Sequence, residues 1–319
     1  MKIGIIIINY NSTEYTLKCL NSLTKQLSKE VMEIVVVDNH STDKRLDEIK
    51  KKFPAVTLLL NQENLGFSEG NNVGIRYVLK RGCDYILLLN NDTRVAPGFI
   101  DALLLQSQKI ADKGILCPKI YFENGSETHK DRYTKDQIGK VIWYAGGIID
   151  WKNMLASHRG VDEVDKGYYE SFEKTDYATG CAMFIPKLCF DRVGLLDQKL
   201  YLYYEDLDFC RRAFKKGFFS YYVPSAVMWH ANAVSSGGTG SDLQSYYITR
   251  NRLLIGMRYA PWKTKLALFR EAANLVVNGT KTQREAVGDF LRKQFGKRGK
   301  RNWFIPKMPN LLRFVKQKK

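Results

Sequence analysis

Four short clusters in this sequence carry side chains that could bind a cation or move a proton. Asp38 and the Asn-Asn-Asp of residues 90–92 each follow an apolar run, residues 205–208 hold three acids, and His230 closes a later apolar run. Carboxylate oxygens are the ligands that Mg²⁺ and Mn²⁺ prefer. A second carboxylate, away from the cation, suits the removal of a proton from an attacking hydroxyl. This combination predicts the displacement of a diphosphate, whose charge a cation would neutralise.

Each cluster also has an ordinary structural explanation. Asn-Asn-Asp is common in turns after strands, and Asp38 could cap a turn or a helix. Acids at 205–208 could complement the dipole of a helix start, and a lone histidine such as His230 is often structural. The glycine-rich residues 64–74 would let a backbone approach a ligand at a helix start, but glycines alone are a weak signal. The clusters therefore gain weight only if the fold brings them together.

The elements needed to do this can be predicted from the first hundred residues. Apolar runs at 3–8, 34–37, 56–60 and 85–89 alternate with helical patterns of leucine and isoleucine. This alternation predicts βαβ units and a mostly parallel sheet flanked by helices, an α/β fold. Ligands bind beyond the carboxyl ends of such strands. The polar clusters follow those ends, so we expect them at one rim of the sheet.

Length and charge predict two parts in this chain of 319 residues. We expect one large domain over 1–260 and a basic helical extension over 261–319. Residues 262–319 hold sixteen Lys and Arg against three acids, a charge of +13, whereas the other 261 residues carry +4. Six scattered cysteines without CxxC spacing predict buried, reduced thiols of a cytoplasmic protein. The apolar start is too short for a signal peptide, and no run is long enough to cross a bilayer.

The basic extension predicts contact with an anionic membrane surface. Residues 290–319 contain eleven basic residues and no acid, interleaved with aromatic and aliphatic side chains, five of which recur at helical spacing between Phe304 and Val315. This mixture is typical of interfacial segments, although a solvated tail remains an alternative. A nucleic-acid partner is not expected because no recognition motif accompanies the charge. The predicted location is cytoplasmic, peripheral on the inner face of the plasma membrane.

The combined motifs over residues 3–260 resemble glycosyltransferase family 2, of the GT-A fold, in its rhamnosyltransferase-like branch. The segments that carry the resemblance are VVVDNHSTD, NLGFSEGNNVGI, LLLNNDT, TGCAMFIPK, LYLYYEDLDFCRRA and VMWHANAVSS. The metal motif of other members is DxD, and here Asn90 stands in place of the first acid. Asp92 is then the only acid of that motif, which leaves more of the charge balance to His230 and the donor phosphates.

The resemblance implies a role for each candidate residue. Asp206 would be the catalytic base with Glu205 in support, and Asp92 and His230 would bind Mg²⁺ or Mn²⁺. The residues expected to bind the nucleotide sugar are Ile8, Tyr10, Asp38, Gly66, Asn71 and Asn91, with Tyr10 and Asp38 at the base. The resemblance also implies inversion at the anomeric carbon in one displacement, which needs one base.

The reaction expected from the resemblance is transfer of a sugar to a hydroxyl of a glycan or lipid-linked acceptor in surface polysaccharide synthesis. dTDP-rhamnose is the favoured donor, and other dTDP- or UDP-sugars remain open. A nucleotidyltransferase would need a basic triphosphate-binding loop near the first strand, but residues 3–12 contain no Lys or Arg. A noncatalytic membrane-binding module would leave the strand-end polar clusters unexplained.

Overall fold

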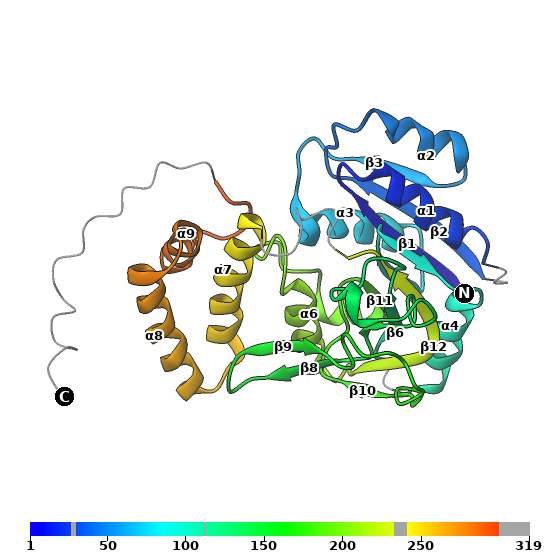
Figure 1. Cartoon of the computed structure of the whole chain (residues 1–319). Helices are drawn as coiled ribbons and strands as arrows, with labels where there is room; N and C mark the ends of the chain where they lie inside the picture. The colour runs from blue at the N-terminus through cyan, green and yellow to red at the C-terminus, as the bar shows by residue number, and fades with distance from the viewer. Residues whose placement is uncertain (27–29, 112, 233–240, 300–319) are drawn as a thin grey trace, which may run out of the picture.

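A ten-stranded mixed sheet forms the centre of the protein. The structure, a computed structural model, describes residues 1–26, 30–111, 113–232 and 241–299. The strand order is β10-β12-β6-β11-β4-β1-β2-β3, with β5 paired to β12 and β7 to β6. In Figure 1 the sheet lies beside a separate group of C-terminal helices, α7, α8 and α9.

The amino-terminal half of the sheet is parallel, as the apolar runs predicted. It contains β1 (Lys2–Asn9), β2 (Val31–Asp38), β3 (Thr57–Leu60) and β4 (Tyr85–Asn90). Helices α1 (Thr13–Leu23), α2 (Asp47–Lys52) and α3 (Gly66–Lys80) connect these strands. Asn9 pairs in register with Asp38, and Ile8 with Asn90, so the polar strand ends share one rim.

The remaining half of the sheet mixes directions. Its long strands are β6 (Ile115–Phe122), β11 (Ala182–Pro186) and β12 (Ser220–His230). The short strands β5 (Thr93–Val95), β7 (Ile142–Tyr144) and β10 (Glu173–Thr175) extend it, and β8 (Gly147–Asp150) and β9 (Leu155–His158) form a separate hairpin. Helices α4 (Phe99–Lys109), α5 (Lys187–Val193) and α6 (Glu205–Phe214) belong to this half. β11 runs antiparallel to both β4 and β6, so its amino end lies at the rim where β4 ends.

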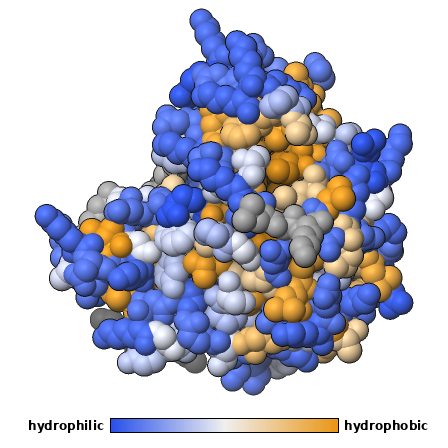
Figure 2. Space-filling model, turned by 90° about the vertical axis from the view of Figure 1, so that its right-hand side faces the viewer, coloured by the Kyte–Doolittle hydropathy of each residue, from blue (hydrophilic) through white to orange (hydrophobic). Residues whose placement is uncertain are grey.

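The core consists of the sheet and the helices packed on both of its faces. Ile3, Ile5, Ile6 and Ile7 of β1 are completely buried, as expected for a central parallel strand covered on both sides. On the face drawn in Figure 2, hydrophilic residues cover most of the surface and apolar residues show in patches between them. All six cysteines are buried and unpaired, which confirms the expectation of free thiols.

The C-terminal helices α7 (Asp242–Tyr259), α8 (Trp262–Asn278) and α9 (Lys281–Leu291) form a second apolar cluster with residues of the β8–β9 hairpin, of α6 and of the loop before α6. The predicted boundary at 260 falls between α7 and α8, and as a domain boundary it stays a prediction. The helical pattern expected between Phe304 and Val315 lies outside the described residues. Within the described residues, no helix is both long and apolar enough to cross a membrane.

Candidate active site

A pocket of about 940 Å³ opens at the rim where the polar strand ends meet. Its walls come from the ends of β1, β2, β4, β9 and β12, from β7, from the starts of α3, α6 and α7, from the loop before β11, and from the segment after α9. Of the predicted site residues, those that line it are Ile8, Tyr10, Gly66, Asn91, Asp92, Glu205, Asp206 and His230. The gathering expected from the strand ends is therefore observed, while the role of each residue stays a prediction.

Asp92 and His230 lie against each other in this pocket. His230 Nε2 is 3.1 Å from Asp92 Oδ1, and both side chains are buried. Two distant segments meet here because β12 pairs with β5, which places His230 opposite Thr93. Burial lowers the pKa of His230, but the Asp92 carboxylate and Cys181 outweigh it, so this pKa lies well above its ordinary value. Burial raises the pKa of Asp92, but His230 outweighs it and the net direction is downward.

The pair offers a divalent cation one carboxylate and one imidazole. Among the described residues there is no group of three or more His, Cys, Asp and Glu side chains that could hold a metal ion. Two protein ligands nevertheless fit Mg²⁺ or Mn²⁺, because these ions usually complete their shell with substrate phosphates and water. In the described part of the chain, the Nδ1 atom of His230 is buried without a hydrogen-bond partner.

Glu205 and Asp206 open helix α6 and face the same pocket. The Asp206 carboxylate accepts hydrogen bonds from the Gly180 N–H at 2.8 Å and from the Leu207 N–H at 2.7 Å. These bonds tie it to the loop before β11. Burial raises the pKa of Asp206, which makes its carboxylate a stronger base. Burial and then the Asp206 charge raise the pKa of Glu205 well above its ordinary value, and Glu205 Oε2 is buried with no hydrogen-bond partner among the described residues.

Asp208, the third acid of the cluster, has a different environment. Its carboxylate accepts from Arg212 Nε at 2.8 Å, Arg258 Nη1 at 2.9 Å and the Tyr259 hydroxyl at 2.7 Å. The side chain is completely buried and does not line the pocket. Asp208 therefore joins α6 to the end of α7, and only the first two acids of the cluster are available for chemistry.

The loop before α6 holds three tyrosines in the left-handed backbone region. Tyr201, Tyr203 and Tyr204 have φ of 64°, 67° and 72°. This conformation costs a bulky residue roughly 1–2 kcal/mol. Buried Asn251 of α7 supports the loop: its Nδ2 donates to the Leu200, Leu202 and Tyr203 carbonyls, each at 2.9 Å.

Arg250, the neighbour of Asn251, reinforces the same loop. Its guanidinium is completely buried and donates to the carbonyls of Lys199, Leu200 and Gly296. The loop in turn fixes the start of α3, because the Tyr201 carbonyl accepts from the Phe67 and Ser68 N–H groups. Helix α7 thus positions the tyrosine loop, and through it both the glycine-rich segment and the acidic pair.

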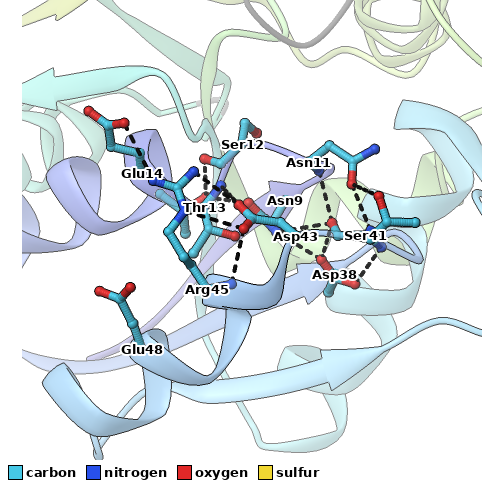
Figure 3. Close-up of polar contacts among 12 residues, drawn as sticks. Asn9, Asn11, Ser12, Thr13, Glu14, Asp38, Ser41, Asp43, Arg45 and Glu48 are labelled. Atoms are coloured by element: carbon cyan, nitrogen blue, oxygen red, sulfur yellow. Dashed lines mark hydrogen bonds and ion pairs between the residues drawn. The ribbon is translucent and has the colours of Figure 1, made fainter.

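Asp38 and Asn71 lie beside the pocket and do not line it. Asp38 Oδ1 accepts from Asn9 Nδ2 at 2.8 Å and from the Ser41 hydroxyl, while Oδ2 accepts from the Ser41 N–H at 2.9 Å, as Figure 3 shows. Asn71 is buried and donates to the Phe67 carbonyl within α3. The neighbour of Asp38, Asn39, lines the pocket instead. Nucleotide contact by Asp38 and Asn71 stays a prediction.

Several pocket residues were not predicted from the sequence. Trp143 lies between two histidines, with ring centroids 4.3 Å from His158 and 4.5 Å from His230. Burial lowers the pKa of His158 to about 4, so its ring is neutral at neutral pH. Trp143 lies in β7 and His158 in β9. A histidine and a tryptophan without a neighbouring motif give no sequence signal; only the fold brings them to His230.

Comparison with known proteins identifies the family of this fold and site. The sequence profile described as Glycosyl transferase family 2 matches residues 4–185, more than half of the chain. The chain belongs to glycosyl transferase family 2. The matched range includes β1 to β4, and the predicted catalytic residues Glu205 and Asp206 of this transferase lie beyond it. The resemblance of its motifs to this family is thereby confirmed.

Two curated relatives extend the comparison over most of this glycosyltransferase. The N-acetylglucosaminyl-diphospho-decaprenol L-rhamnosyltransferase of Mycobacterium tuberculosis is 24% identical over 266 residues, covering 81% of this chain and 85% of the relative. The dTDP-rhamnosyl transferase RfbF of Shigella flexneri is 27% identical over 260 residues, covering 78% of each chain. Both of these relatives are named as rhamnosyltransferases, which agrees with the branch that the motifs resemble.

Solved structures show the same fold. GalNAc-T7, crystallised with UDP, GalNAc and Mn²⁺, matches with a TM-score of 0.64 at 17% identity, covering 92% of this chain and 56% of that one. The mannosyltransferase PcManGT from Pyrobaculum calidifontis, in complex with GDP-Man and Mn²⁺, matches with a TM-score of 0.51 at 15% identity, covering 91% and 74%. These likenesses confirm the predicted GT-A architecture.

Proposed function

We propose that this glycosyltransferase moves a sugar, with rhamnose favoured, from a dTDP- or UDP-sugar to a hydroxyl of a glycan or lipid-linked acceptor in surface polysaccharide synthesis. The observation that carries the proposal is that the Asp92–His230 pair and the Glu205–Asp206 pair line the same pocket. The printed activities of the two curated relatives support rhamnose as the sugar, and one of them supports a lipid diphosphate as the acceptor class.

The donor would lie across the rim, with its nucleotide near Tyr10 and its diphosphate near Asp92 and His230. Mg²⁺ or Mn²⁺ held by these two residues would supply positive charge to the leaving diphosphate. Asn90 and Asn91, which also line the pocket, offer neutral amides beside that position. The neutral rings of Trp143 and His158 form a wall next to His230, where we place the sugar.

Asp206 would act as the base on the acceptor side. The acceptor oxygen attacks the anomeric carbon, its proton passes to an Asp206 carboxylate oxygen, and the bond to the diphosphate oxygen breaks. The N–H groups of Gly180 and Leu207 hold the carboxylate in one orientation for this transfer. One displacement with one base inverts the anomeric carbon, in agreement with the expectation from the motifs.

A screen of donors tests the sugar and nucleotide choice. The full chain is heated with dTDP-rhamnose, UDP-glucose, UDP-N-acetylglucosamine or GDP-mannose, each with and without MnCl₂. A ligand present at 100 times its dissociation constant adds about 2.7 kcal/mol of stability, so the true donor class should raise the melting temperature clearly. The proposal predicts the largest increase with dTDP-rhamnose and MnCl₂. An increase with GDP-mannose alone would contradict the assigned donor class.

A further inference from the structure

Helix α8 carries an apolar stripe on its solvent side. Trp262, Leu266, Phe269 and Val277 are 66%, 50%, 50% and 53% exposed. Their spacings of four, three and eight residues place them on one face of a helix with 3.6 residues per turn. Exposed Ala273 lies between Phe269 and Val277 on the same face. Side chains of this size and number are unusual on a free helix surface.

The opposite face of α8 accounts for its attachment to the protein. Thr264, Leu268 and Ala272 are buried there, and Thr264 donates to the Lys152 carbonyl at 2.9 Å. A Cβ built on Gly256 of α7 would lie 2.2 Å from Leu268 Cδ1, which shows how closely the two helices pack. The apolar stripe therefore has no part in holding α8 in place.

Cations border the stripe on both sides. Lys263 and Arg270 lie on one flank and Lys265 on the other, and in the described residues none of them forms a salt bridge. The only acid of α8 is Glu271, which points to α7 and pairs with Arg252. The exposed side of the helix thus combines an apolar centre with positive edges and carries no carboxylate.

We propose that α8 is a membrane-docking face that lies in the interface of an anionic lipid bilayer, with its apolar stripe among the acyl chains and its cations at the headgroups. The docking itself does not depend on the proposed function. Only its role does, which is to bring the pocket close to a lipid-linked acceptor. An apolar stripe with basic flanks and a tryptophan at one end has the chemistry of an interfacial helix.

Charge favours anionic lipid over two other possible partners of this face, which are residues 300–319 and a second copy of the chain. Residues 300–319 of the chain carry seven Lys and Arg and no acid, so their docking on α8 would set cations against Lys263, Lys265 and Arg270. A second copy packed on the same face would also bring like charges together. Anionic lipid is the occupant that complements both the stripe and its borders, and the basic end of the chain adds to the same attraction.

Vesicle sedimentation of the full chain tests the proposal. Vesicles of phosphatidylcholine with one third phosphatidylglycerol are compared with vesicles of phosphatidylcholine alone. The double variant Leu266→Asn, Phe269→Asn removes the centre of the stripe, and we expect its affinity for the anionic vesicles to fall about tenfold or more. The matched control is Leu105→Asn, Leu155→Asn, whose leucines are 53% and 57% exposed on α4 and β9, and it should bind as the original chain does.

Three results would overturn the inference. The first is that the stripe variant sediments as well as the original chain, which would assign any binding to residues 300–319. The second is that the original chain does not bind anionic vesicles. The third is that the original chain is a dimer in solution and the stripe variant is a monomer. The melting-temperature increase with dTDP-rhamnose and MnCl₂ is measured on every variant and should be unchanged. Loss of vesicle binding with that increase retained supports docking, whereas absence of the increase in all chains contradicts the proposed donor and leaves the docking result standing.

Discussion

Glu205 and Asp206 are adjacent in sequence, yet the structure gives their carboxyl groups different surroundings. Asp206 accepts two backbone hydrogen bonds that stabilise its charged form, whereas Glu205 Oε2 is buried and finds no partner in the part of the chain that the structure describes. A carboxylate that N–H groups orient and keep charged is suited to act as the catalytic base. A buried acid with a strongly raised pKa suits the protonated state, in which it can donate to an acceptor oxygen or to Asp206 itself.

The raised pKa of Glu205 predicts a stability effect with a definite sign. Because the folded protein holds this proton more tightly than the unfolded chain, stability is unaffected below the ordinary carboxyl pKa and falls as the pH rises towards the folded value. Gln is neutral at every pH, so Glu205→Gln removes the cost of protonating this buried side chain on folding, and we expect it to raise the unfolding free energy at pH 7 by about 1–3 kcal/mol. Denaturant unfolding at pH 4.5 and pH 7 measures the difference, which should shrink at the lower pH.

Glu48→Gln is the control for this variant. Glu48 lies on the exposed surface of α2, where a hydrogen bond from Lys52 lowers its pKa, so its loss should not stabilise the protein. If Glu205→Gln lowered stability equally at both pH values, the carboxyl would have a structural partner and our account of its pKa would be wrong.

Asp92 has a separate role in the proposed mechanism, and a conservative change isolates it. Asp92→Asn keeps the shape of the side chain and removes the charge that faces His230. We expect the affinity for dTDP-rhamnose in the presence of MnCl₂ to fall at least about tenfold, because a cation loses its only carboxylate in this motif. Isothermal titration with and without EDTA measures this. Asp101→Asn, on the exposed side of α4, should leave affinity unchanged; an Asp92 variant that bound normally would argue against metal ligation there.

At the scale of elements, α7 supports the site without lining most of it. Asn251 Nδ2 holds three carbonyls of the tyrosine loop, and Asn251 Oδ1 accepts from Arg250 Nε at 3.0 Å. Asn251→Leu removes these three hydrogen bonds from the loop and takes the side-chain acceptor away from Arg250 Nε, and we expect a loss of about 2–4 kcal/mol in unfolding free energy. The loop would also relax from its left-handed conformation, so turnover at saturating donor should fall further than the stability loss explains.

Asn274→Leu makes the same chemical change on the exposed surface of α8 and controls for it. Denaturant unfolding and steady-state kinetics on both variants give the comparison. Equal stability of the two variants would show that the Asn251 contacts contribute little, and that the tyrosine loop is held by Arg250 or by its own packing.

The sequence allowed the parallel half of the fold to be predicted because its strands are short apolar runs that end in polar residues. Residues 3–8, 34–37, 56–60 and 85–89 correspond to β1 to β4, and the helix expected to open with the glycine-rich residues 64–74 begins at Gly66. The mixed half gave weaker signals. β5, β7 and β10 have three residues each, too short for a periodic pattern, and their pairing depends on distant strands.

At the scale of the whole molecule, the gathering of the site follows from topology. Carboxyl ends of β1 and β4 meet at one rim, and the reversed β11 adds its amino end, which brings residues 179–181 to Asp206. This convergence could be anticipated for the amino-terminal clusters. The positions of Trp143 and His158 could not, because they depend on β7 and on the β8–β9 hairpin, whose packing the sequence does not encode in any local pattern.

The C-terminal extension, residues 261–319, could also be predicted only in part. Its charge excess and helical character could be predicted from composition, and α8 and α9 are helices. The return of the chain to the pocket could not be predicted: Lys297 and Arg298 are among its lining residues, and Lys297 Nζ lies 3.1 Å from a Glu63 carboxylate oxygen. The basic C-terminal part thus contributes to the site itself as well as to the proposed membrane-docking face on α8.

The most direct test of the account compares chemistry and binding in one variant, Asp206→Asn. The change keeps the side chain's size and removes the base, so transfer of rhamnose from dTDP-rhamnose should fall by about 10²- to 10⁴-fold while the dissociation constant for dTDP-rhamnose with MnCl₂ stays within about twofold of the original. Transfer at the original rate by this variant would contradict the assignment of Asp206 as the base and, with it, the mechanism proposed for the pocket.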